Sequence, residues 1–113
     1  MQIKKWYVYL ADLNPKMGTE PGKVRPVVVV QTDLLNGLHP STVICPLTTK
    51  VQPKAQFLRV HLTKREAGLK GNSDIMVDQI RAIDKQRLVD YIGKLDADKM
   101  QEVDKALRKS LAL

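Results

Sequence analysis

The sequence has few residues of the kinds that form redox and metal sites, with one cysteine and two histidines in 113 residues. A single cysteine excludes an intrachain disulfide. No Cys/His cluster has the spacing of a metal site, so we expect neither a metal nor another cofactor. Cys45 lies in the apolar run 43–47 without a flanking base or cation, which indicates a buried, unreactive thiol.

Long hydrophobic runs are also absent. No apolar stretch approaches 18 residues, and the N-terminus carries no hydrophobic signal core. The sequence therefore predicts no membrane segment and a cytoplasmic protein. Repeats, low-complexity segments and linkers are missing as well, so we expect a single domain over residues 1–113.

The chain has a clear excess of positive charge. Its formal net charge is +7 and its isoelectric point is about 9.7. The excess is spread along the chain, with seven Lys/Arg against three Asp/Glu in residues 1–57 and twelve against nine in residues 58–113. Such a balance favours a polyanionic or acidic partner.

Short apolar segments separated by turn residues predict a mainly β structure. We expect strands at about residues 5–12, 26–32, 42–48, 56–62 and 74–80, with a short sixth at 88–93. The second is a continuous apolar run, typical of a central strand buried on both faces. Asn36-Gly37 marks a turn between the second and third strands.

The C-terminal part of the chain is predicted to be a helix that begins after Asp96, a suitable N-cap. Met100, Val103, Leu107 and Leu111 recur at spacings of three and four, which predicts an apolar stripe packed on the sheet. Short strands with one terminal helix predict a small antiparallel barrel.

A glycine-rich polar loop, Gly18–Pro26, leads directly into the second strand. Pro26 has no N–H and restricts Arg25 to an extended backbone, so the guanidinium is expected to be aimed rather than free. A fixed cation beside free backbone N–H groups suits a phosphate, which indicates an anion site in this loop.

Two motifs make the chain resemble the MazF/PemK family of toxin endoribonucleases. The first is Gly-x-Glu-x-Gly-x-x-Arg-Pro at 18–26, and the second is Asp-Gln-x-Arg-x-Ile-Asp at 78–84. Asp12-Leu13-Asn14-Pro15 and Pro46-Leu47-Thr48-Thr49 also match, in the family's order and spacing.

The resemblance implies an SH3-like barrel that forms a homodimer. It implies metal-independent cleavage of single-stranded RNA into 2′,3′-cyclic phosphate and 5′-hydroxyl ends. It also implies a cognate antitoxin whose acidic C-terminal segment occupies the RNA groove.

The resemblance also implies which residues act. Arg25 would bind the phosphate, and Thr48 would donate its hydroxyl to a non-bridging oxygen. The residues expected to bind substrate are Thr19, Lys23, Thr49, Asp78 and Gln79. The general base is open, because arginine does not readily deprotonate. Glu20, beside Arg25 in the loop, is the first carboxylate to test and Asp78 is the second.

Simpler interpretations stand beside these. Glu20 is equally well a solvated loop charge, and Gln79 has structural hydrogen bonding as an alternative to reading a base edge. For Trp6 and Tyr9, packing in the core or in an interface is favoured over stacking on bases. For the whole protein, the alternatives are a toxin-fold module that binds a protein such as gyrase and a general single-strand RNA-binding barrel.

Two departures from the family pattern affect these expectations. Relatives usually carry Arg-Gly-Asp/Glu before the first strand, where this chain has Lys5-Trp6-Tyr7. Some relatives have an arginine two residues before the Asp of the second motif, where this chain has Met76. A cationic role assigned to that position elsewhere does not transfer to Met76.

Overall fold

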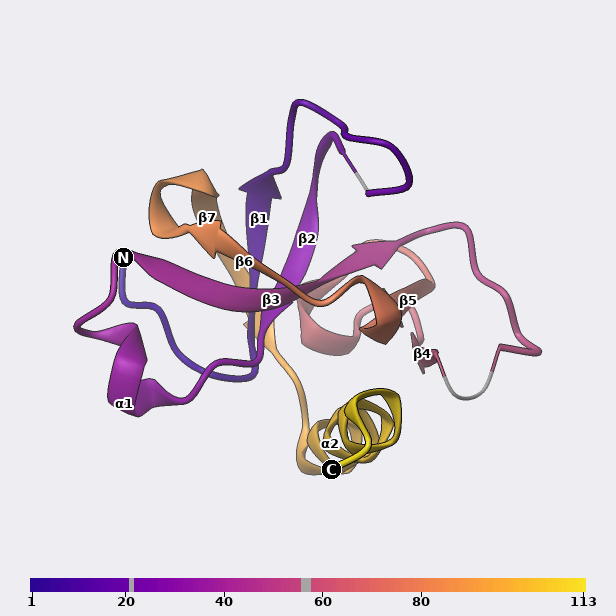
Figure 1. Cartoon of the computed structure of the whole chain (residues 1–113). Helices are drawn as coiled ribbons and strands as arrows, with labels where there is room; N and C mark the ends of the chain where they lie inside the picture. Colours follow the sequence, from indigo (N-terminus) through magenta and orange to yellow (C-terminus); the bar gives the residue numbers. More distant parts are fainter. Residues whose placement is uncertain (21, 56–57) are drawn as a thin grey trace.

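The computed structural model describes residues 1–20, 22–55 and 58–113 (Figure 1). Its strands are β1 (Tyr7–Asp12), β2 (Val24–Val29), β3 (Ser41–Thr48), β4 (Arg59–Leu62), β5 (Ser73–Met76), β6 (Arg81–Asp84) and β7 (Leu88–Lys94). The helices are α1 (Asp33–Asn36) and α2 (Ala97–Leu111), with 3-10 turns η1 (Glu66–Gly68), η2 (Val77–Gln79) and η3 (Lys85–Arg87). The protein is therefore mainly β with a C-terminal helix, as predicted.

The strands form one antiparallel sheet in the order β4-β5-β3-β2-β1-β7, with β6 also paired to β3. β2 lies in the middle, where Val28 is opposite Val8 of β1 and Cys45 of β3. The two faces of β2 enter different core clusters. Val28 packs in the cluster that contacts α2, whereas Val27 and Val29 pack with Tyr9 on the other side. This arrangement confirms that the apolar second strand is central and buried on both faces.

The sheet is strongly curved but does not close into a barrel by strand pairing, which corrects that part of the expectation. β4 and β7 are the two ends of the order and do not pair in the described part of the chain. Instead, η1 packs against β7 at close range. A Cβ on Gly93 would lie 2.4 Å from the Ala67 carbonyl oxygen, and one on Gly68 would lie 2.3 Å from that of Ile92. Because neither glycine has a side chain, the backbones of η1 and β7 can come into direct contact.

This close contact predicts the effect of Gly93→Ala. The new methyl would overlap a backbone oxygen that no side-chain rotation can move aside, so η1 and β7 must separate. We expect a loss of about 1–3 kcal/mol in the free energy of unfolding, measured by urea denaturation. Gly71→Ala is the matched control, because a Cβ at Gly71 meets nothing within 4 Å. Equal stability of the two variants would contradict the packing.

α2 covers one side of the sheet, with Asp96 as its N-cap (Figure 1). The Asp96 carboxylate accepts a hydrogen bond from the Lys99 amide at 2.9 Å, as the sequence predicts. Val103 is fully buried, and Met100 and Leu107 pack beside it against the core. Leu111 is half-exposed, so the predicted stripe ends one turn early, and Ala106 is buried instead.

Trp6 lies directly before β1. Its φ of 71° lies in the left-handed region that favours glycine. Two backbone hydrogen bonds hold it there, from the Trp6 amide to the Val29 carbonyl and from the Leu95 amide to the Trp6 carbonyl. The indole packs on the α2 side of the core, with the Lys5 ammonium 4.8 Å above its ring. The strained backbone therefore links β1, β2 and the start of α2.

The structure corrects several predicted elements. The strand expected at 74–80 ends at Met76, and η2 follows it with Val77 buried in the core. β6 is not among the strands predicted from the sequence; it pairs with β3 over Ile44 and the three residues before it. The Asn36-Gly37 turn is the end of the short helix α1. The strand expected at 56–62 is seen as β4, and positions 56–57 lie outside the described residues.

Among the described residues, no helix is long and apolar enough to cross a membrane.

Candidate active site

A pocket of about 270 Å³ opens where β2 begins and β3 ends. The described residues that line it are Lys23, Val24, Arg25, Pro26, Leu47, Thr48, Thr49, Lys50 and Ser73. They come from the end of the glycine-rich loop, from β2, from the end of β3 with the segment after it, and from the first residue of β5. The pocket therefore joins two regions that the sequence motifs mark separately.

Arg25 is held in place by two backbone carbonyls. Its Nε donates to the Gly22 oxygen at 2.9 Å, and one Nη donates to the Leu47 oxygen at 3.1 Å. A guanidinium has five N–H groups, so three are not used by these two bonds. Burial lowers the pKa of Arg25 below its ordinary value, and the group stays charged at neutral pH. The site thus presents a cation that is already oriented.

The loop that carries Arg25 is fastened at its base. The Leu13 amide donates to the Lys23 carbonyl at 2.8 Å, and the Lys23 amide donates to the Asn14 side chain at 2.9 Å. Arg87 donates to the carbonyls of Asp12 and Asn14 at 3.0 and 2.7 Å. These contacts fix the direction in which the chain enters β2, and hence the place of Arg25.

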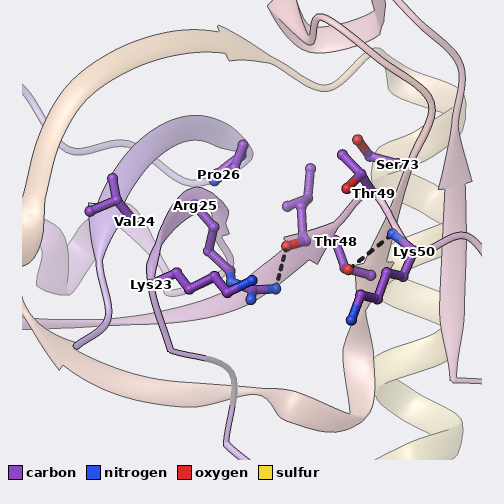
Figure 2. A pocket seen from close by; sticks show the side chains of 9 residues that line it. Lys23, Val24, Arg25, Pro26, Thr48, Thr49, Lys50 and Ser73 are labelled. Carbon is purple, nitrogen blue, oxygen red and sulfur yellow. Dashed lines mark hydrogen bonds between the residues drawn. The ribbon is translucent and has the colours of Figure 1, made fainter. Parts of the chain in front are cut away.

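Thr48 ends β3 on the other side of the pocket. Its hydroxyl oxygen accepts a hydrogen bond from the Lys50 amide at 3.1 Å, which leaves the hydroxyl proton available as a donor. Figure 2 shows Arg25 and Thr48 reaching into the pocket from opposite walls, with the Lys23 and Lys50 side chains extending beside them. Among the described residues, three cations and no carboxylate line the cavity, so it attracts an anion.

The predicted site residues divide into two groups. The pocket brings together Arg25, Thr48, Lys23 and Thr49. Thr19 and Glu20 stay in the glycine-rich loop away from the lining, where Thr19 is exposed and the Glu20 amide donates to the Met17 carbonyl. Asp78 and Gln79 lie in η2, outside the pocket, with Asp78 exposed. None of the described residues that line the pocket beside Arg25 and Thr48 carries a carboxylate or an imidazole.

Sequence reasoning missed Ser73, which borders the pocket from the start of β5. It lies 25 positions after Thr48, and no motif marks it. Only the pairing of β3 with β5, where Leu47 is opposite Ile75, brings it to the rim. The nearest sequence signal is the Gly71-Asn72 turn, which predicts a strand start but not its partner.

Cys45 and the two histidines take no part in the pocket. Burial raises the pKa of the Cys45 thiol to about 12, with a smaller contribution from the negative charge of Asp78. The thiol is therefore unreactive at neutral pH, as expected. Among the residues that the structure describes, no three His, Cys, Asp or Glu side chains are grouped so as to hold a metal ion.

Comparisons with known proteins agree with this geometry. Residues 4–111 match the family described as PemK-like, MazF-like toxins of type II toxin–antitoxin systems. The chain is 42% identical to the endoribonuclease EndoA of Bacillus subtilis over 113 residues, covering 100% of this chain and 97% of that protein.

Solved structures share the fold at lower identity. MazF from Deinococcus radiodurans superposes with a TM-score of 0.85 at 24% identity, covering 100% of this chain and 99% of that one. A mycobacterial endoribonuclease in complex with its cognate antitoxin superposes with a TM-score of 0.80 at 23% identity, covering 98% of this chain and 96% of that one. The family match spans almost the whole chain, including both walls of the pocket, and the chain therefore belongs to the PemK-like, MazF-like toxins of type II toxin–antitoxin systems.

Proposed function

We propose that this chain is a metal-independent endoribonuclease that cleaves single-stranded RNA and acts as the toxin of a toxin–antitoxin pair. The observation that carries the proposal is the anchored Arg25, which faces Thr48 across a pocket that also holds Lys23 and Lys50. Family membership and the likeness to an endoribonuclease support the same reaction.

The reaction fits what the pocket offers. The 2′-oxygen of the RNA attacks the neighbouring phosphorus, and the bond from phosphorus to the 5′-oxygen breaks. The proton lost from the 2′-hydroxyl balances the proton gained by the 5′-oxygen, so the step consumes no water or co-reactant. The free N–H groups of Arg25 and the hydroxyl of Thr48 would stabilise the charge that develops on the phosphorane oxygens.

The remaining predicted residues have secondary places in this proposal. Lys23 and Thr49 would bind the phosphate and sugar nearest the cleaved bond, because they line the pocket. Thr19, Asp78 and Gln79 would contact flanking nucleotides. Glu20 is the first carboxylate to test as general base; since it is not among the residues that line the pocket, we expect it to take part only if the loop moves.

Partners follow from the charge and the family. An acidic antitoxin segment would compete with RNA for the cationic pocket, and its inhibition would weaken at high salt. A homodimer is also part of the proposal. It is supported by large apolar side chains exposed to solvent, since Leu34 and Leu38 are each 82% exposed. We infer a cytoplasmic location, because a toxin that cuts messenger RNA acts where that RNA is.

The test is incubation of the purified protein with a long single-stranded RNA in excess EDTA. We expect discrete fragments whose new 5′ ends accept a phosphate from a kinase without prior phosphatase treatment. Intact RNA that stays bound would favour a general RNA-binding barrel. Intact and unbound RNA would favour a module that acts on a protein target such as gyrase.

A further inference from the structure

A buried carboxylate lies beside the pocket without being part of its lining. The Asp74 side chain, on β5, has no exposed surface. One oxygen accepts hydrogen bonds from the Gln52 amide at 2.8 Å and from an Arg59 Nη at 3.1 Å. The other is 2.5 Å from His61 Nδ1. Burying a carboxylate costs several kcal/mol of desolvation unless hydrogen bonds and opposite charges offset it, and here three partners do so.

Strand register places this cluster in line with the pocket. Thr48 of β3 is opposite Asp74 of β5, and Asp74 is opposite His61 of β4. Directly opposed residues of antiparallel strands have side chains on the same face. Arg59 is two residues before His61 and so shares that face. Thr48, Asp74 and His61 therefore form one row across three strands, and Arg59 lies beside this row on the same face.

The cluster also holds the chain that follows Thr48. Arg59 donates through an Nη to the Lys50 carbonyl at 2.9 Å, as well as to Asp74. Asp74 accepts from the Gln52 amide two residues later. These two hydrogen bonds tie residues 50–52 to β4 and β5 just beyond the end of β3. Lys50 is in the pocket wall, and its amide donates to the Thr48 hydroxyl.

Asp74 is charged at neutral pH. Burial by itself raises the pKa of its carboxyl, but the hydrogen bonds from Gln52, His61 and Arg59 together hold the pKa below its ordinary value. The carboxylate form accepts from all three donors, whereas a protonated or amide side chain would have to turn one N–H or O–H toward a donor.

We propose that Asp74 is a positioning residue of the cleavage site, acting through Arg59 and the Gln52 amide to hold the Thr48–Lys50 wall opposite Arg25. The inference rests on the proposed RNA cleavage. Removing the carboxylate frees residues 50–52, and the Thr48 hydroxyl loses its fixed orientation. Arg25, Lys23 and the phosphate contacts they provide stay in place. Turnover therefore suffers more than substrate binding.

The experiment compares Asp74→Asn, Arg59→Gln and the double variant with wild type. Asp104→Asn is the matched control, since it removes a carboxylate from another ion pair with arginine, an exposed one on α2. A short RNA with one cleavage site gives kcat and KM, and hydrogen exchange followed by mass spectrometry reports on residues 49–55. We expect kcat to fall at least about tenfold in Asp74→Asn, with KM changed less than about threefold, and exchange in 49–55 to rise. The double variant should be no worse than the worse single variant.

Several outcomes would overturn the proposal. Unchanged kcat and unchanged exchange in a folded Asp74→Asn protein show that the cluster does not position the wall. A smaller salt dependence of RNA affinity in Arg59→Gln shows that Arg59 binds phosphate itself. If Asp74→Asn does not fold, Arg59→Gln decides by the same two measurements. Wild-type protein that fails to cut RNA refutes the proposed function. The hydrogen-exchange comparison of residues 49–55 still tests whether Asp74 and Arg59 hold residues 50–52 in place.

Discussion

Replacing Arg25 with alanine is expected to slow RNA cleavage at least about 100-fold. Preorganised donors aimed at developing charge each contribute about 3–4 kcal/mol to a transition state. Arg25 keeps three N–H groups for this after its bonds to Gly22 and Leu47. The measurement is single-turnover cleavage of a short RNA at saturating enzyme, which removes differences in binding.

Two controls separate chemistry from folding. Arg108→Ala removes an exposed arginine of α2 and changes the net charge equally, and it should cleave at the wild-type rate. Arg25→Ala loses two hydrogen bonds to carbonyls, so its free energy of unfolding is expected to drop by about 1–3 kcal/mol, with circular dichroism unchanged. Wild-type cleavage by the folded Arg25→Ala protein would refute the assignment of Arg25.

Replacing Asp74 with asparagine is expected to destabilise the fold in a pH-dependent way. The substitution keeps the shape of the side chain but removes its charge from Arg59, whose side chain is only 16% exposed. Hydrogen bonds to charged groups contribute about 1.5–3 kcal/mol, and loss of one partner from a buried pair costs about 3–5 kcal/mol. We expect a loss of about 3 kcal/mol in the free energy of unfolding at pH 7.

The direction of the pH effect follows from the depressed pKa of Asp74. The unfolded carboxyl takes up its proton near pH 3.9, at a higher pH than the folded one. The stabilisation is therefore complete above that pH and is lost as the pH falls through the lower folded pKa. Urea unfolding of the wild type and of Asp74→Asn from pH 7 to pH 3 should show the difference between their free energies of unfolding becoming smaller at the acidic end. A difference that stays constant would contradict the role of the ionised carboxylate.

Local sequence pattern was sufficient for most of the elements. The apolar run after Pro26 predicts a central strand because a strand covered on both faces needs apolar side chains at every position. Asp96 and the spacing that follows it predict α2 because both signals lie within a few residues of each other. The short elements β6 and α1 span four residues each, too few to show a period, and so the sequence did not reveal them.

The candidate site shows the same division. Arg25 and Thr48 are marked by motifs, because the chemistry of phosphate binding depends on residue type in a short stretch of chain. Ser73 and Asp74 carry no such mark, since their place depends on the register of β5 between β3 and β4. A shift of one residue in that register would turn every β5 side chain to the other face.

The sequence by itself determined the family, the mainly β fold with its terminal helix, the cationic loop and the candidate phosphate-binding pair. The tertiary structure decided that the sheet stays open and is bridged by η1 against β7, that Glu20 lies outside the pocket, and that Asp74 anchors the chain after Thr48. The physical reason is distance along the chain. Periodicity, capping and motif chemistry act within a few residues, whereas sheet closure and a buried charge cluster depend on contacts between segments that only the folded chain brings together.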